Sequence, residues 1–186
     1  ILILSLQMSS ANVPPLEVEF GDIHENNIGQ LRKINLGIFP VRYNDKFYSN
    51  VVTTPPEFTQ FAYWNGFVVG SICSRLEPST GPGPKKLYIM TLGVLAAYRR
   101  RSIGKKLLMR TLEALESRPD ITEIYLHVQV SNDTAIQFYH SCGFETKEMI
   151  PNYYKRIEPP DCYLLSKCLV RKNDQINDEE DVAVVE

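Results

Sequence analysis

The fold is most clearly indicated by residues 85–117, KKLYIMTLGVLAAYRRRSIGKKLLMRTLEALES. Its first part, 85–95, is a long apolar run typical of a buried strand. Its last part, 101–117, repeats apolar side chains with the period of a helix, so that one face is apolar: Ile103, Leu107, Leu108, Leu112 and Leu115. A strand, a basic loop and an amphipathic helix in this order favour an α/β domain.

Working outward, apolar periodicity and turn residues predict the remaining elements. Asn65-Gly66 separates two apolar runs and is typical of a type I′ hairpin. Asp22 and Glu25 have the spacing of a capping box, so we expect a helix from about residue 23. The predicted strands are 16–20, 59–64, 67–76, 85–95, 122–130, 144–150 and 161–170, and the predicted helices are 23–37, 45–52, 101–117 and 134–142. This order predicts a mixed central sheet of about seven strands with flanking helices.

Composition points to one globular domain. The chain has 186 residues, of which 44% are hydrophobic and 23% are charged, as in ordinary globular proteins. The last fourteen residues, 173–186, carry six acids and no base. We expect a disordered leader at 1–15, a domain at 16–170 and an acidic disordered tail at 171–186. The body carries only a weak positive charge, so we expect no direct nucleic-acid binding. No apolar run approaches the ~18 residues of a membrane span, so we expect no membrane association.

The four cysteines do not suggest a metal site or a disulfide framework. Cys73, Cys142, Cys162 and Cys168 form no C-x-x-C pair and lie among apolar neighbours. We therefore expect buried, reduced thiols, no metal, and a cytoplasmic protein that could also enter the nucleus.

The loop between the strand and the helix of 85–117 is strongly basic. Between Arg99 and Arg110 there are six bases and no acid. Free backbone N–H groups and the positive end of a helix dipole make such a junction an anion site. The alternative is a solvated basic helix face; the strand–loop–helix position favours a phosphate.

This junction resembles the acyl-CoA signature [RQ]-x-x-G-x-[GA] of the GNAT superfamily of N-acetyltransferases. Arg99 and Gly104 match its ends, and Ser102 replaces its middle glycine. Four further segments occur in family order: IFPVRYNDKFY (38–48), LYIMTLGVLAAYRR (87–100), IYLHVQVSNDTAIQFY (124–139) and NYYKRIEP (152–159). Together they resemble the NatE branch of the N-terminal acetyltransferases, over residues 16–168.

The resemblance implies acetyl-CoA as co-substrate and the residues that bind it. The implied set is Leu92, Gly93, Val94, Arg99, Arg100, Arg101, Ser102, Ile103, Gly104, Lys105, Asn132 and Tyr139. We expect the backbone of 92–94 to pair with the pantetheine arm where two parallel strands diverge. Serine at 102 should be harmless if its φ is negative, as at an ordinary helix start, so we expect cofactor binding to survive. Tyr139 would protonate the leaving thiolate.

The chemistry needs a proton acceptor, because an α-amine with a pKa of ~7.7–8.0 is mostly protonated near neutrality. Strand alternation predicts that Tyr88, Met90 and Leu92 share one face, and that His127 shares a face with Tyr125 and Gln129. Alone, His127 could be a core histidine and Tyr88 a packing aromatic. The resemblance implies that these two residues deprotonate the α-amine through a water, with direct attack in a ternary complex.

Two aromatic segments are implied to bind the substrate. The residues are Phe39, Pro40, Val41, Tyr43, Met90, Tyr153, Tyr154 and Ile157. An apolar pocket with tyrosine hydroxyls suits a methionine side chain, so the expected substrates are protein N-termini with a retained Met followed by an apolar residue. A NatA-type ribosome-associated complex is an expected partner.

Three other interpretations remain open at this point. The protein could acetylate lysine side chains, whose pKa of ~10.4 requires stronger base assistance. It could be a catalytically silent adaptor of a larger acetyltransferase complex. It could also use a cysteine nucleophile, which ping-pong kinetics would reveal.

Overall fold

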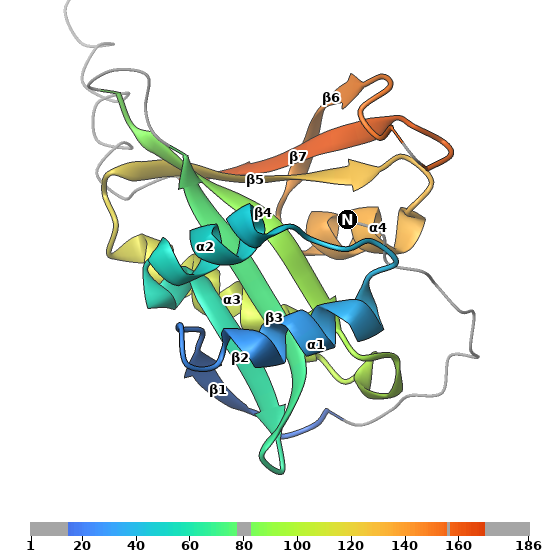
Figure 1. Cartoon of the computed structure of the whole chain (residues 1–186). Coiled ribbons are helices and arrows are strands. Elements are labelled where there is room, and N and C mark those ends of the chain that lie inside the picture. The colour runs from blue at the N-terminus through green and yellow to red at the C-terminus, as the bar shows by residue number, and fades with distance from the viewer. Residues whose placement is uncertain (1–14, 78–82, 156, 170–186) are drawn as a thin grey trace, which may run out of the picture.

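The computed structural model describes residues 15–77, 83–155 and 157–169. They form a seven-stranded sheet in the order β1-β2-β3-β4-β5-β7-β6, shown in Figure 1. The strands are β1 Glu19–Asp22, β2 Thr59–Trp64, β3 Phe67–Glu77, β4 Lys85–Val94, β5 Ile121–Gln129, β6 Glu145–Ile150 and β7 Cys162–Cys168. The β4–β5 pair is parallel and the other described pairs are antiparallel, which confirms the predicted mixed sheet.

Helices cover both faces of the sheet. They are α1 Ile28–Ile38, α2 Asp45–Thr53, α3 Ile103–Glu116 and α4 Asp133–Ser141, with short 3-10 turns η1 Pro56–Phe58 and η2 Ala96–Tyr98. Figure 1 shows α1 and α2 on one face, and α3 and α4 on the other. Each face has its own apolar core: Leu107, Leu126 and Val128 are in the core under α3 and α4, whereas Leu31 and Met90 are in the core under α1 and α2. In the described part of the chain, none of the helices has the length and apolar character to span a bilayer.

The first helix begins later than predicted. Residues 24–27 form a turn instead, in which the Asn27 side chain accepts from the His24 N–H at 2.8 Å and donates to the Asp22 carbonyl at 2.9 Å. Ile23 is buried in the core beside α1. The expected capping box of Asp22 and Glu25 is therefore wrong, because the Asn27 amide satisfies these backbone groups in its place.

A β-bulge in β4 changes which side chains share a face. Ser74 pairs with Ile89 and Cys73 with Thr91, so Met90 is an extra residue on β4. Met90 packs under α1 and α2, whereas Leu92 packs in the core under α3 and α4. The prediction that Leu92 shares a face with Tyr88 and Met90 is wrong, because strict alternation is interrupted at the bulge. The Asn65-Gly66 turn has positive φ at both residues, as a type I′ hairpin requires.

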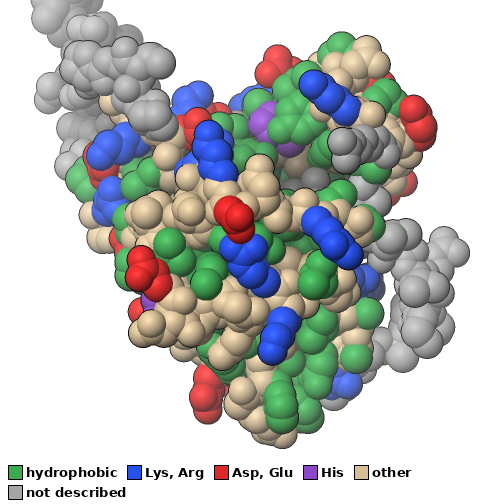
Figure 2. Space-filling view, in the orientation of Figure 1, with side chains coloured by type: hydrophobic (Ala, Val, Ile, Leu, Met, Phe, Trp, Pro, Cys, Tyr) green, Lys and Arg blue, Asp and Glu red, His purple; other side chains and the backbone are tan. Residues whose placement is uncertain are grey.

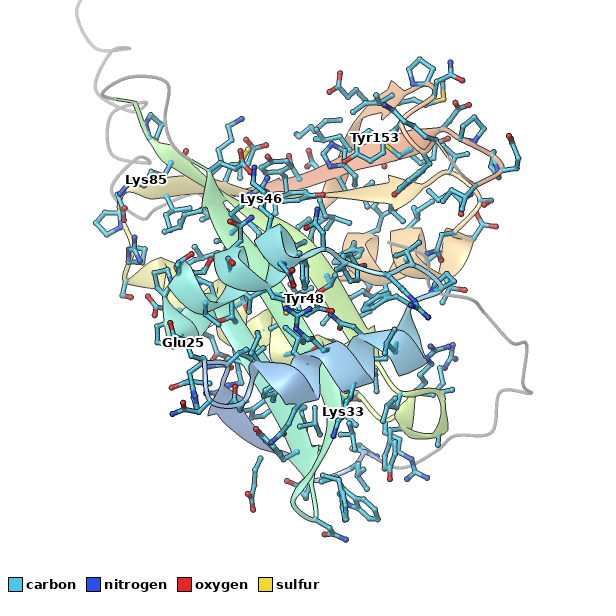
Figure 3. The ribbon with its side chains drawn as sticks, in the orientation of Figure 1. Glu25, Lys33, Lys46, Tyr48, Lys85 and Tyr153 are labelled. Atoms are coloured by element: carbon cyan, nitrogen blue, oxygen red, sulfur yellow. The ribbon has the colours of Figure 1, made fainter. Side chains whose placement is uncertain are left out.

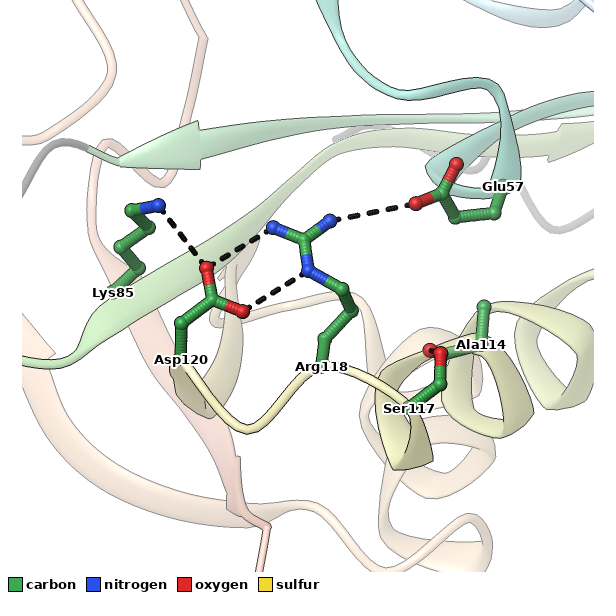
Figure 4. A network of polar contacts seen from close by, with 6 residues as sticks. All are labelled: Glu57, Lys85, Ala114, Ser117, Arg118 and Asp120. Atoms are coloured by element: carbon green, nitrogen blue, oxygen red, sulfur yellow. Dashed lines mark hydrogen bonds and ion pairs between the residues drawn. The ribbon is translucent and has the colours of Figure 1, made fainter.

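An ion network fixes the start of the β4–β5 pair (Figure 4). The Arg118 guanidinium contacts both carboxylate oxygens of Asp120, at 3.0 and 3.1 Å, and reaches Glu57 beside η1 at 3.4 Å. Lys85 Nζ, at the start of β4, lies 3.0 Å from Asp120. Hydrogen bonds from these two cations hold the pKa of the Asp120 carboxyl well below its usual range. The network therefore ties the turn after α3 to the beginning of both parallel strands.

The proposed domain limits lie mostly at the edges of the described residues. Of the expected leader only residue 15 is described, and the expected acidic tail lies wholly outside the described residues. The two ends of the expected domain, 16–170, therefore stay a prediction.

Candidate active site

The parallel strands β4 and β5 separate in the middle of the sheet. They pair from Lys85 opposite Ile121 to Tyr88 opposite Tyr125. Beyond that point β4 stays paired with β3 and β5 with β7, so residues 89–94 of β4 have no partner on β5. Strands that diverge in this way present unpaired backbone groups to any extended ligand between them.

Tyr88 and His127 meet at this fork. The Tyr88 hydroxyl lies 3.4 Å from His127 Nδ1. The His127 ring also stacks on Tyr153, with ring centroids 4.6 Å apart and planes 19° apart. Figure 3 shows Tyr153 on the segment that joins β6 to β7. The sheet and this loop thus bring three of the predicted site residues together.

Burial sets the protonation states of this pair. It lowers the pKa of His127 below its ordinary 6.5, so the imidazole is neutral near pH 7 and can accept a proton. Burial, with smaller effects of Tyr153 and other tyrosines, raises the pKa of Tyr88. Tyr88 is therefore a neutral phenol, which can hold or relay a proton but carries no charge of its own.

The start of α3 differs from the prediction in one respect. Ser102 has φ 62° and ψ 5°, in the left-handed region, and its side chain makes no capping hydrogen bond. The expected negative φ is therefore wrong, because the chain has to reverse between η2 and α3, and it does so through positive φ at Arg100 and Ser102. This geometry explains why the family signature has a glycine at this position.

The other junction residues differ in their contacts and in their exposure. The Arg99 side chain turns back and donates to the Val94 carbonyl at 3.0 Å, which links the end of β4 to the loop. Ile103 is 1% exposed, so only its backbone can serve a ligand. Arg100 and Lys105 are exposed, Arg101 and Gly104 are half-buried, and all four lie on the junction as predicted.

Helix α4 places the last two expected cofactor residues. The Asn132 side chain caps α4 by accepting from the Ala135 N–H at 3.2 Å. Tyr139 is 1% exposed and shares a core with Leu92 and Val128, which lie on the two diverging strands. Its hydroxyl has no hydrogen-bond partner among the described residues, and burial raises its pKa. A buried phenol in this state is available to a ligand.

The predicted substrate residues lie on two loops near the Tyr88–His127 pair. Phe39, Pro40, Val41 and Tyr43 form the α1–α2 loop, and Tyr153, Tyr154 and Ile157 lie on the β6–β7 loop. Phe39 and Tyr43 pack in the same core as Met90 and Tyr88. Burial is the main cause that raises the pKa of Tyr154. Figure 2 shows the surface hollowed between α2 and the β6–β7 arm.

Several residues of the site were not among the predicted ones. The Tyr125 ring lies 5.0 Å from that of Tyr88, and the Arg75 guanidinium lies 5.2 Å from the Tyr88 ring centroid. Gln129 Nε2 donates to the Pro159 carbonyl at 2.8 Å, and the Asp161 carboxylate accepts from the Asn152 N–H at 2.8 Å, so both hold the β6–β7 loop. Tyr125 and Gln129 share the face of His127, a pattern that could have indicated them.

Burial keeps two of the four cysteines as unreactive thiols. Cys73 and Cys162 are buried as expected, but Cys142 is only partly buried and Cys168 is exposed near the end of β7, so the prediction of buried thiols is wrong for these two. Burial raises the pKa of Cys73 to about 12 and that of Cys162 to about 11, which keeps both as thiols. The described residues contain no cluster of His, Cys, Asp and Glu side chains that could hold a metal.

Comparisons with known proteins agree with this geometry. Residues 28–144 match the model of the acetyltransferase (GNAT) family. The chain is 49% identical over 152 residues to N-alpha-acetyltransferase 50 of Danio rerio, covering 82% of this chain and 89% of that protein. It is 44% identical over 154 residues to the probable N-acetyltransferase san of Drosophila melanogaster, covering 83% of this chain and 82% of that protein.

A solved structure shows the same fold. It is that of Arabidopsis thaliana Naa50 in complex with the bisubstrate analogue CoA-Ac-MVNAL, with a TM-score of 0.77 and 45% identity, covering 83% of this chain and all of that chain. The fork in the sheet, the basic helix start and these likenesses lead to one conclusion: the chain belongs to the GNAT family of acetyltransferases.

Proposed function

We propose that this protein is an acetyl-CoA-dependent N-alpha-acetyltransferase of protein N-termini, which prefers a retained Met followed by an apolar residue. The observation that carries the proposal is the Tyr88–His127 pair, 3.4 Å apart, at the fork between β4 and β5. Helix α3 follows the end of β4 through the basic loop, and residues of the two aromatic loops pack in the core of Tyr88 or on the His127 ring. The likeness to N-alpha-acetyltransferase 50 and to Naa50 bound to CoA-Ac-MVNAL supports both acetyl-CoA as the acetyl donor and a peptide N-terminus as the acetyl acceptor.

The described residues fit acetyl-CoA in three places. The edge of β4 at 92–94 has no partner strand on the β5 side, although the Val94 carbonyl accepts from Arg99, and it can pair with the amide groups of the pantetheine arm. The first turn of α3 offers backbone N–H groups for phosphates, with Arg100 and Lys105 exposed beside it. The unpartnered, buried Tyr139 hydroxyl can bond to the thioester end.

Acetyl transfer requires two proton transfers, one from the α-amine and one to the leaving thiolate. Acetyl-CoA, when bound, supplies the acetyl group as a thioester. Neutral His127 accepts the proton of the incoming α-amine, directly or through a water, and the Tyr88 hydroxyl can relay it, because only the neutral amine is a nucleophile. The Tyr139 phenol, kept protonated by its raised pKa, can donate a proton to the leaving thiolate. The raised thiol pKa values of Cys73 and Cys162 favour direct transfer over an acyl-cysteine.

The substrate preference follows from the walls of the site. Phe39 and Met90 are buried in one apolar core, and Tyr43 packs against that core. A linear apolar side chain can enter such a site while tyrosine hydroxyls bond to its backbone. The protein would work in the cytoplasm or nucleus, in association with a NatA-type ribosome-associated complex.

One experiment separates this function from its alternatives. The protein is incubated with acetyl-CoA and two peptides, one beginning Met-Leu and one blocked at its N-terminus with an internal lysine, and masses are measured. Acetylation of the first peptide alone is the expected result. Acetylation of the second alone would indicate a lysine acetyltransferase, and acetylation of neither would indicate a silent adaptor.

A further inference from the structure

A groove outside the catalytic fork runs between α1, the α1–α2 loop and α2. Its volume is about 270 Å³, and its walls include Arg32, Leu36, Arg42, Tyr43 and Tyr48. Figure 3 shows Tyr48 between α1 and α2, and Figure 2 shows basic side chains over the same two helices. Of the residues that line this groove, only Val41 and Tyr43 are also predicted substrate residues, and Tyr43 packs in the same core as Tyr88 and Met90.

The groove contains a buried amide without partners. Asn35 lines it and is 1% exposed, yet neither its Oδ1 nor its Nδ2 has a hydrogen-bond partner among the described residues. Buried polar groups in native proteins are almost always hydrogen-bonded, so an amide with both atoms unpaired points to a ligand. The complementary group must donate one hydrogen bond and accept another. A peptide group does both.

The groove is also lined by charge and apolar surface that suit a polypeptide. The Arg32 guanidinium is held in place, 2.7 Å from the Asp45 carboxylate and 3.9 Å from the centroid of the Tyr48 ring. Arg42 is exposed and takes part in no ion pair within the part of the chain that the structure describes. Leu36 and Val41 are 62% and 41% exposed, which gives the groove an apolar edge. The ligand is thus a chain segment with an acidic side chain near Arg42.

We infer that this groove binds the substrate's own polypeptide, downstream of the residues at the catalytic fork, and favours acidic side chains there. The inference rests on the proposed function, because Tyr43 makes the groove continuous with the substrate site. A peptide group of the substrate bonds to the Asn35 amide, and a carboxylate pairs with Arg42. Substrate choice then depends on residues well beyond the first two.

Peptides of different length test this inference. The first is Met-Leu-Gly, and the others extend it to ten residues with either glutamates or lysines after the third position, which adds about 23 Å of extended chain. For the wild type we expect the KM of the glutamate decapeptide to be about fivefold or more below that of the tripeptide, with kcat unchanged. The lysine decapeptide should lack this advantage.

Two variants locate the effect in the groove. Asn35→Leu replaces the amide by an apolar group of similar size, and Arg42→Ala removes the unpaired cation; each should abolish most of the advantage of the glutamate peptide while leaving the tripeptide rate unchanged. Melting curves show whether Asn35→Leu is folded, and Arg42→Ala provides a second test on an exposed residue. Lys33→Ala is the matched control, because it removes the same charge from α1 at a residue that does not line the groove (Figure 3).

The outcomes separate the two proposals. If the wild type acetylates the tripeptide but shows one KM for all lengths and charges, the groove inference is overturned and the proposed function stands. The inference also fails if both groove variants keep the full glutamate advantage, as they would if Asn35 bonds only to a structural water. If no peptide of the series is acetylated, the proposed function itself fails.

Discussion

The Tyr88 hydroxyl lies 3.4 Å from His127 Nδ1 although the two residues are 39 positions apart. The register of the parallel strands explains this contact. Tyr88 is opposite Tyr125 in the last described β4–β5 pair, and His127 lies two residues further along β5, on the same face as Tyr125. The two rings therefore meet where the strands separate, so that an imidazole able to accept a proton lies beside the part of β4 that has no partner on β5.

The pH dependence of turnover should reflect a histidine with a lowered pKa. Burial lowers the pKa of His127, and the neutral imidazole is the form that accepts a proton. Activity that depends on this form is present above its pKa and is lost as the pH falls through it. With saturating peptide, we expect the acid limb of kcat to have its midpoint below about 6.5, the ordinary histidine value. A midpoint clearly above that value, or a wild-type limb that persists in His127→Ala, would contradict this assignment.

Substitutions of Ser102 should distinguish backbone geometry from side-chain chemistry. A left-handed φ costs an L-residue roughly 1–2 kcal/mol, part of which glycine recovers. We expect Ser102→Gly to raise the melting temperature slightly and to change acetyl-CoA affinity by less than about threefold, because the backbone N–H remains. Ser102→Val should weaken binding about tenfold, since a β-branched residue is strongly disfavoured at positive φ. Isothermal titration measures each affinity. No binding by the wild type, with binding restored in Ser102→Gly, would show that serine is not tolerated here.

Gly93 should be needed for the packing of the α1–α2 loop against β4. A Cβ at this position would lie 2.6 Å from Ile38 Cγ2 and 2.8 Å from Phe39 Cζ. Gly93→Ala should displace Phe39, lower stability by about 1–3 kcal/mol and raise the KM of a Met-Leu peptide. The matched control is Gly29→Ala in α1, where a Cβ meets nothing within 4 Å. That change should stabilise the protein by about 0.5–1 kcal/mol. Equal free energies of unfolding for the two variants, measured by denaturant titration, would contradict this packing role.

Gln129 should act on the substrate through the β6–β7 loop. Its side-chain amide donates to the Pro159 carbonyl at 2.8 Å, and the loop carries Tyr153, which stacks on His127. Gln129→Ala removes one buried hydrogen bond to the loop. We therefore expect it to raise the peptide KM several-fold while acetyl-CoA affinity stays unchanged. Steady-state kinetics and titration measure the two quantities. A loss confined to acetyl-CoA binding would show that Gln129 acts on the cofactor site and not on the β6–β7 loop.

Hydrophobic periodicity and turn residues were sufficient to predict the order of the elements, because the cores of both sheet faces repeat regularly. They did not predict the bulge at Met90, since one extra residue in a strand leaves no compositional trace, and Leu92 was assigned to the wrong face as a result. The Asn27 turn was missed because a carboxylate pair at capping-box spacing looked like a helix start.

The candidate site was predictable to a similar extent. Tyr88 and His127 could be named from their strands and from the family resemblance, but their contact depends on the β4–β5 register, which the sequence does not reveal. Arg75 reaches Tyr88 from the neighbouring strand β3, so no local motif links the two. Asn35 has the spacing of a core position of α1, and only its unpartnered amide in the folded chain distinguishes it from an apolar neighbour.

The central claim is that Tyr88 and His127 act as one unit on the substrate's proton. Its most direct test is a double-mutant cycle of Tyr88→Phe, His127→Ala and the double variant, with kcat/KM for a Met-Leu peptide and acetyl-CoA affinity measured for each. We expect each single change to lower turnover by about a hundredfold or more, the double variant to lose little beyond the worse single, and acetyl-CoA affinity to stay within about threefold. Wild-type turnover in either single variant, or losses that simply multiply in the double variant, would contradict the claim.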